Sequence, residues 1–172
     1  MDRTAFSKLA PADAVAALRS FPRRFRAPLR NAERNDPDPE ELADTVAPSG
    51  RSPREVVIDT ARSLALLGHA VDQTLTHDEP TLHPAVLDRS RREWPAETAS
   101  TVAEEIDLLE EEAGSFADVV ERAPANAWGR TAKVADDGST TAHELLTEAM
   151  ATVSGNLRDF EADLAALRTR SR

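Results

Sequence analysis

The chain has 172 residues, a formal net charge of −10 and no cysteine. This length suits one domain with a hydrophobic core, and the acidic balance argues against general binding to nucleic acid through phosphate neutralisation. Without cysteine there are no disulfides, zinc–thiolate sites or thiol nucleophiles. No apolar run is long enough to span a membrane, and the start of the sequence lacks the apolar core of a signal peptide. We therefore expect a single cytoplasmic domain over residues 1–172.

Apolar residues at helical spacing predict a first helix over about residues 13–33. Pro22 lies inside this pattern and should kink the helix or split it. Several arginines crowd the same region, namely Arg19, Arg23, Arg24, Arg26, Arg30 and Arg34. Two interpretations stay open: a solvated face that pairs with acidic neighbours, or a patch for an anionic partner. The preference for arginine over lysine is typical of high-GC coding, as in actinobacteria.

A second helix is predicted over Ser52–Thr76, with a helical turn before it near residues 40–45. Ser52 and Glu55 have the spacing of a capping box, and Pro53 suits the first helical position. The helix is apolar on several sides, so other helices should surround it. Asp59 breaks this apolar pattern. A carboxylate in such a position is costly unless it is paired, solvated or bound to a ligand, so Asp59 is the first candidate functional residue.

Two more helices are predicted over Glu97–Glu121 and Thr141–Leu167, the last one opening with a capping box of Thr141 and Glu144. The many acidic residues of the Glu97–Glu121 helix are expected on its solvated face. Residues 77–84 and 123–139 read as loops, and residues 85–94 as an irregular or helical piece. No hairpin dipeptide separates segments of alternating polarity, so no strand is predicted. The expected fold class is all-α, a four-helix bundle.

Three segments carry a resemblance to a known family. Residues 51–59 (RSPREVVID) are similar to its motif Trp-Ser-x-x-Glu-Val-x-x-His. The second likeness is residues 78–82 (DEPTL) followed later by Trp128-x-Arg130, and the third is residues 138–146 (GSTTAHELL) running into the last helix. In this order they resemble the DinB-like superfamily, which includes mycothiol-dependent maleylpyruvate isomerase and the bacillithiol and mycothiol S-transferases.

The resemblance implies a divalent metal held by three histidines, one on the second helix and two on the fourth. In this chain the three positions fall on Asp59, Thr152 and Asn156. Imidazole suits zinc, nickel and iron, whereas carboxylate and carbonyl oxygens suit magnesium, calcium and manganese. We therefore expect no tightly bound transition metal; a weak oxygen-ligand site, or a shift in this mapping, is the alternative. The chain's histidines, which are His69, His77, His83 and His143, are expected in loops or on the surface.

The resemblance and the position of Asp59 together predict a pocket in the bundle, lined by Asp59, Thr152, Asn156, Arg62, Trp128 and Arg130. Asp59 is the candidate general acid or base. The alternative is a structural role, in which its carboxylate accepts hydrogen bonds from Asn156, Thr152 or Arg62. Trp128 is expected to be a lid packed on the bundle end, and Arg130 an ion-pair partner; ligand contact is the alternative for both.

Three functions are compatible with these residues. The first is binding or transformation of a small molecule near Asp59, with no cofactor expected. The second is a metal-dependent S-transferase or isomerase that uses mycothiol or bacillithiol, the metal activating the thiol. The third is a non-catalytic interaction protein, for example a homodimer. A deep polar-ended cavity would favour the first, and a large exposed apolar patch on the first helix would favour the third.

Overall fold

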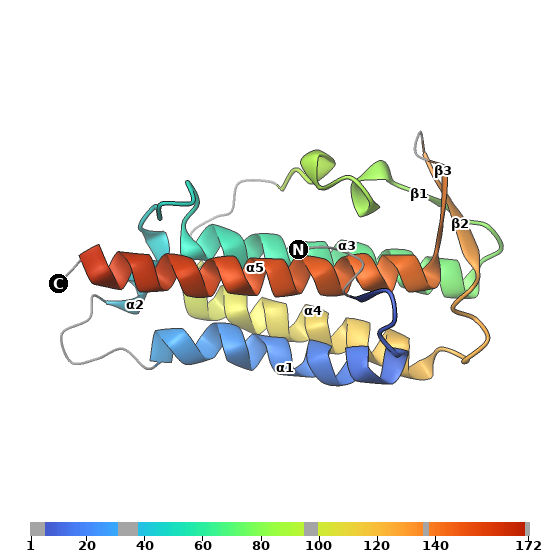
Figure 1. Cartoon of the computed structure of the whole chain (residues 1–172), viewed down its shortest axis with the longest axis horizontal. Helices are drawn as coiled ribbons and strands as arrows, with labels where there is room; N and C mark the ends of the chain where they lie inside the picture. Colours follow the sequence, from blue (N-terminus) through green and yellow to red (C-terminus); the bar gives the residue numbers. More distant parts are fainter. Residues whose placement is uncertain (1–5, 31–37, 95–99, 136–137, 171–172) are drawn as a thin grey trace.

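The computed structural model describes residues 6–30, 38–94, 100–135 and 138–170. Its long helices are α1 (Pro11–Arg30), α3 (Pro53–Thr76), α4 (Val102–Arg122) and α5 (Ala142–Arg170), and α2 (Pro39–Asp44) is short. Helix α3 packs against α4 and α5, and α1 packs against the same two helices, so the long helices close a ring around the core (Figure 1). The predicted all-α four-helix bundle is confirmed.

Apolar residues at helical spacing fill the interior of this ring. The rings of Phe25 on α1 and Phe160 on α5 lie 5.0 Å apart, centroid to centroid, and both side chains are buried. Leu64 of α3 and Leu109 of α4 are also fully buried. Burial of such side chains stabilises the fold by about 1.5–3 kcal/mol each.

Capping boxes set the starts of three helices. Ser52 and Glu55 bond reciprocally at α3, and Thr141 and Glu144 do so at α5, as the sequence predicts. A third capping box, Thr101 with Glu104, begins α4 at Val102, so Ser100 and Thr101 are not helical, although the sequence predicted that they would be. The predicted start at Glu97 lies outside the described residues. Helix α5 continues to Arg170, beyond the predicted end at Leu167.

Pro22 does not split the first helix, because α1 runs without interruption from Pro11 to Arg30 and contains both Pro22 and Pro28. A proline inside a helix removes a backbone hydrogen bond. Here Phe21, Pro22 and Phe25 are all buried against the bundle, so tertiary packing offsets that loss. The predicted residues 31–33 of this helix lie outside the described part of the chain.

A small sheet, which the sequence did not predict, lies at one end of the bundle (Figure 1). Its strands are β1 (Thr81–Leu82), β2 (Thr131–Val134) and β3 (Gly138–Thr141), in the order β1-β2-β3. Strand β1 pairs parallel to β2, with Thr81 opposite Lys133, and β2 pairs antiparallel to β3, with Thr131 opposite Thr141. Two- to four-residue strands are too short to show a clear alternation in sequence.

The chain between α3 and α4 is the part of the fold that matters for the site. After β1 it forms two 3₁₀ turns, η2 (Pro84–Val86) and η3 (Arg89–Arg91), and lies across α3 and α5 as far as Trp94 (Figure 1). We call residues 83–94 the connection.

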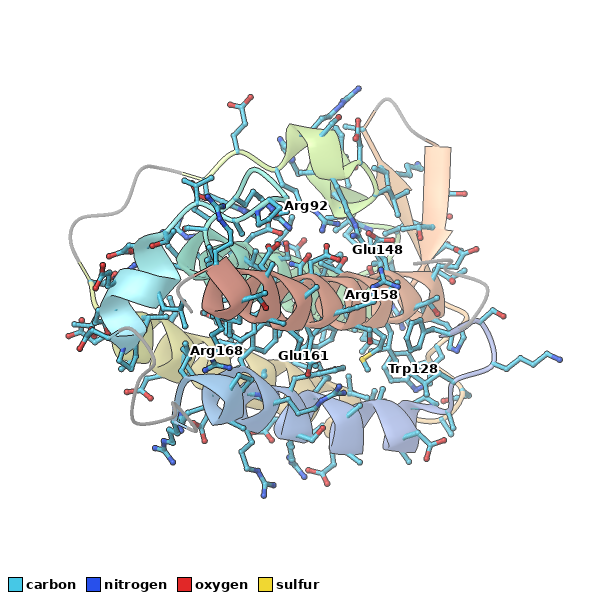
Figure 2. All side chains as sticks on the ribbon, turned by 60° about the vertical axis from the view of Figure 1, so that its left-hand side comes forward. Arg92, Trp128, Glu148, Arg158, Glu161 and Arg168 are labelled. Carbon is cyan, nitrogen blue, oxygen red and sulfur yellow. The ribbon has the colours of Figure 1, made fainter. Side chains whose placement is uncertain are left out.

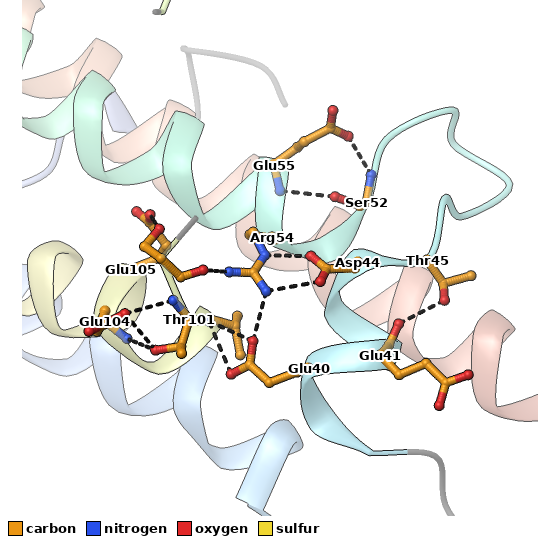
Figure 3. A network of polar contacts seen from close by, with 12 residues as sticks. Glu40, Glu41, Asp44, Thr45, Ser52, Arg54, Glu55, Thr101, Glu104 and Glu105 are labelled. Carbon is orange, nitrogen blue, oxygen red and sulfur yellow. Dashed lines mark hydrogen bonds and ion pairs between the residues drawn. The ribbon is translucent and has the colours of Figure 1, made fainter. Parts of the chain in front are cut away.

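At the opposite end of the bundle from the sheet, Arg54 joins three elements. Its guanidinium bonds Glu40 and Asp44 of α2 and the carbonyl oxygen of Ser100 before α4 (Figure 3). The Asp44 hydrogen bond raises the pKa of Arg54 above its usual value, although desolvation opposes this. Glu40 also accepts a hydrogen bond from the backbone N–H of Val102, so a side chain of α2 contributes to capping the N-terminus of α4.

Candidate functional site

Buried polar side chains gather along one interface of the bundle, between α3 and α5. We call this group the polar seam. Its members are Asp59, Thr60 and Ser63 of α3, Glu148, Thr152 and Asn156 of α5, and Arg92 and Trp94 of the connection. Except for Asp59 and Trp94, their side chains are almost completely buried. Burying this many polar groups in a small bundle is unfavourable unless they are paired or serve a purpose.

Asp59 is held at the Trp94 end of the seam. One carboxylate oxygen accepts from Trp94 Nε1 at 2.9 Å, and the other accepts from Asn156 Nδ2 at 2.9 Å. Asn156 Nδ2 also lies 2.9 Å from Thr60 Oγ1. The partnership of Asp59 with Asn156 is one that the sequence suggested, whereas the bond from Trp94 was not foreseen.

Arg51 covers Asp59 from the segment before α3. Its guanidinium lies 3.6 Å from Asp59 and 3.9 Å from Asp159 of α5, which are ion-pair distances too long for hydrogen bonds. The side chains of Arg51 and Asp59 are 40% and 28% exposed. Asp59 is therefore the point at which the seam meets solvent, under a loosely held cation.

The other half of the seam is an ion-pair cluster around Glu148. Its Oε1 is 2.9 Å from Arg89 Nε and 3.3 Å from Arg92 Nη2. Thr152 belongs to the same cluster, since its hydroxyl contacts both Glu148 and Arg92. Figure 2 shows Arg92 and Glu148 on the side of α5 that faces the connection.

Burial shapes the electrostatics of Arg92. Desolvation lowers the pKa of its guanidinium, while the negative charges of Glu148 and Asp59 raise it. An arginine remains protonated throughout the working pH range even after such a shift. Arg92 is therefore a permanent positive charge inside the bundle.

The structure brings together some of the predicted site residues and separates others. Asp59, Thr152 and Asn156 meet in the seam, as their predicted positions on facing helices require. Trp128 is buried on the other side of α5, towards α1 (Figure 2). Arg130 bonds Asp78 and the carbonyl oxygens of Thr74 and His77, at the far end of α3 from Asp59. Fifteen residues of helix separate Asp59 from Thr74, about 22 Å.

Trp128 and Arg130 therefore lie outside the seam and fit the roles of packing residue and ion-pair partner. Arg62 follows Asp59 by three residues on α3 and is partly exposed. Bonds are seen for some of the histidines: His77 Nδ1 lies 2.9 Å from Thr76 Oγ1, and His83 caps η2. His143 Nε2 lies 3.3 Å from the carbonyl oxygen of Leu9.

Sequence reasoning missed Arg51, Arg92, Trp94 and Glu148 as site residues. For Glu148 a signal exists, because it precedes Thr152 by four residues, as Thr152 precedes Asn156, which places all three on one helix face. Arg92 and Trp94 belong to a segment without periodicity, so no local pattern shows where they point.

The residues present do not fit a divalent metal at the three positions that the resemblance implies. Asp59 accepts from two N–H donors, and Asn156 presents its amide nitrogen to the same carboxylate. The guanidinium of Arg92 lies 3.4 Å from Thr152 Oγ1, which would place a cation beside any metal there. In the described ranges we find no group of three or more histidine, aspartate or glutamate side chains that could hold a metal.

No protein-family model and no curated protein matches the sequence. Among solved structures, YfiT from Bacillus subtilis is similar, with a TM-score of 0.71 and 17% identity over 95% of this chain and 88% of that one. The chain has a DinB-like four-helix bundle fold.

YfiT is described as a probable metal-dependent hydrolase with an unusual four-helix bundle topology. At this level of identity the DinB-like likeness concerns the fold and leaves the chemistry to be argued from the residues. None of the described helices has a stretch long and apolar enough to cross a membrane.

Proposed function

We propose that this DinB-like bundle binds a small molecule at the exposed end of the polar seam, where Asp59 lies between Arg51 and Trp94, and that it does so without a metal. The observation that carries the proposal is the state of Asp59. Its carboxylate is fixed by Trp94 and Asn156, yet 28% of the side chain is exposed.

The chemistry around the exposed part of Asp59 favours a ligand that donates hydrogen bonds. A carboxylate offers about four acceptor positions, and two of those of Asp59 are used by Trp94 and Asn156. Asp159 adds a second carboxylate nearby, through their shared neighbour Arg51. A primary amine or a polyol could bond both carboxylates while Arg51, which makes no hydrogen bond to either, turns aside.

In this arrangement Asp59 is the residue that binds the ligand, and it is the acid or base if the bound molecule is transformed. Trp94 and Asn156 position it. Arg92 and Glu148 form the fixed, buried end of the seam and do not reach solvent.

The interaction-protein alternative is less well supported. Among the described residues, the exposed large apolar side chains are Val46 and Leu108, and neither lies on α1. The apolar patch on the first helix that this function would require is therefore not seen over Pro11–Arg30.

The test is a thermal-shift screen of small primary amines and polyols, followed by titration calorimetry of any hit. Asp59→Asn should abolish the shift, because the substituted amide loses the charge and half of the acceptor capacity. Asp72→Asn is the matched control, since Asp72 is a partly exposed aspartate of the same helix that lines the groove towards α4. Equal binding by the wild type and Asp59→Asn would contradict the proposal.

A further inference from the structure

Arg92 is the most enclosed charge of the connection. Only 2% of its side chain is exposed, although Arg92 itself lies outside any helix or strand. Its Nη1 lies 3.4 Å from Ser63 Oγ of α3 and 3.4 Å from Thr152 Oγ1 of α5. Its Nη2 lies 3.3 Å from Glu148 Oε1, so the guanidinium touches both helices of the seam.

Two backbone oxygens complete this environment. Arg92 Nε donates to the carbonyl oxygen of Ala85 at 2.8 Å, and Nη2 donates to that of Val86 at 3.2 Å. The guanidinium is thus surrounded by one carboxylate, two hydroxyl oxygens and two carbonyl oxygens. Such an all-oxygen set is the environment that proteins build around a hard cation.

The position of this cation is as informative as its ligands. Thr152 is one of the three positions at which the DinB-like resemblance implies a metal ligand, and the charge of another, Asp59, acts on Arg92. The guanidinium in its oxygen cage therefore contacts one of the three implied positions and lies between the same two helices that carry them. The residues at these positions do not fit a metal, and the positive charge between the helices comes from the chain itself.

We propose that the Arg92 guanidinium is the resident cation of this bundle, which replaces a divalent metal between α3 and α5 and excludes one. Because Arg92 belongs to the connection, its ion pair with Glu148 also holds residues 83–94 against α3 and α5. This inference does not depend on a ligand at Asp59, and it holds or fails independently of the proposed function.

A buried ion pair with no relation to a metal site would also destabilise the protein when broken, so loss of stability alone is not a sufficient test. The distinguishing property is that the vacated cage should accept another cation. Arg92→Ala should leave Glu148, Ser63 and Thr152 facing an empty volume of the size of a guanidinium. Guanidinium ion and Mn²⁺ are the probes, because the first has the lost shape and the second prefers oxygen ligands.

The experiment measures the melting temperature of the wild type, Arg92→Ala and Arg89→Ala, with guanidinium chloride up to about 20 mM or MnCl₂ up to about 5 mM, both concentrations being well below denaturing levels. Arg89→Ala is the matched control, because Arg89 bonds the same Glu148 oxygen but is 44% exposed. We expect each probe to raise the melting temperature of R92A saturably, by about 2–4 °C. Neither should raise that of the wild type or of R89A.

Two results would overturn the proposal. One is a near-stoichiometric divalent metal in the dialysed wild-type protein, measured by elemental analysis after growth with nickel, zinc, iron and manganese. The other is an equal response of R92A and R89A to both probes, which would show that no cation-shaped site was opened.

Should R92A fail to fold, Arg92→Lys provides the test. A lysine loses its proton at a much lower pH than an arginine does. A cage that requires a positive charge favours the protonated lysine, so the melting temperature of R92K, relative to that of the wild type, should fall as the pH rises above about 10. A relative melting temperature that stays constant or rises over this range would show that the cage does not need a charge.

Discussion

Two regions of this protein use arginine in opposite ways. In the polar seam, Arg92 is 2% exposed and each of its nitrogens faces an oxygen of the protein. On the rim between α1 and α4, Arg26 pairs with Asp107 and Glu110, whose side chains are 72% and 57% exposed. Water can replace the partner of a rim arginine at little cost, whereas it cannot reach Arg92.

Ion pairs of α1 bear on the two interpretations of the arginine cluster in the first helix. Arg19 bonds Asp118 and Glu121, and Arg24 lies 3.7 Å from Glu161. These arginines are paired across the α1 surface with acidic residues of α4 and α5, which favours a solvated, self-paired face. Arg34 lies outside the described residues.

The largest expected difference between the seam and the rim comes from breaking the buried ion pair of Arg92 with Glu148. Glu148→Ala leaves Arg92 buried without its carboxylate, and the free energy of unfolding should fall by about 3–5 kcal/mol. Chemical denaturation measures this. The control is the double variant Arg92→Met with Glu148→Leu, which removes both charges and should recover most of the loss. A double variant as unstable as Glu148→Ala would show that packing, and not the unpaired charge, is responsible.

An intermediate effect is expected at Arg54, which is 16% exposed and joins α2 to the start of α4 (Figure 3). Arg54→Ala should lower the free energy of unfolding by about 1–3 kcal/mol, because charged hydrogen bonds to Glu40 and Asp44 are lost. Arg54→Lys keeps the charge but cannot bond both carboxylates with a planar fork. If Arg54→Lys matched the wild type in urea denaturation, the fork geometry would be unimportant.

A small effect is expected on the rim. Arg26→Ala should cost about 0.2–1 kcal/mol, and the difference from the wild type should shrink as salt is raised from about 0.05 M to about 1 M. Glu148→Ala should keep most of its effect in high salt, because the buried pair is shielded from ions. Equal salt dependence of the two variants would remove the distinction between rim and seam.

The smallest effects on stability are expected at two glutamates of α4. A hydrogen bond shifts the pKa of one, and burial shifts the pKa of the other in the opposite direction. The backbone N–H of Thr101 lowers the pKa of Glu104, so Glu104 adds stability above its unfolded pKa that is lost as the pH falls through its folded pKa. Desolvation raises the pKa of Glu112, and the charge of Glu111 adds to this, so Glu112 costs stability above its folded pKa.

Glutamine at these two positions should therefore have opposite signs. At pH 7, Glu104→Gln should lower the urea midpoint and Glu112→Gln should raise it, and both differences should vanish below about pH 4. Urea titrations of both variants at several pH values measure the effect. Shifts of the same sign would mean that neighbouring charges, and not these local causes, dominate.

Sequence periodicity accounts for the helical frame and for one side of the site. Asp59 stood out because a carboxylate interrupted an apolar helix, and Thr152 and Asn156 followed from a spacing of four on α5. The same spacing extends to Glu148. The small sheet escaped prediction because its strands are held by pairing between residues far apart in the chain, such as Thr81 with Lys133, and not by a local pattern.

The sequence by itself therefore determined the helices, their caps and the polar residues that interrupt their apolar faces, since each of these depends on neighbours within about one helical turn. Only the tertiary structure decided what those polar residues meet. Arg92 and Glu148 are 56 positions apart, and Trp94 and Asp59 are 35 apart. Their contacts depend on how an aperiodic connection crosses two helices, and no local spacing encodes that path.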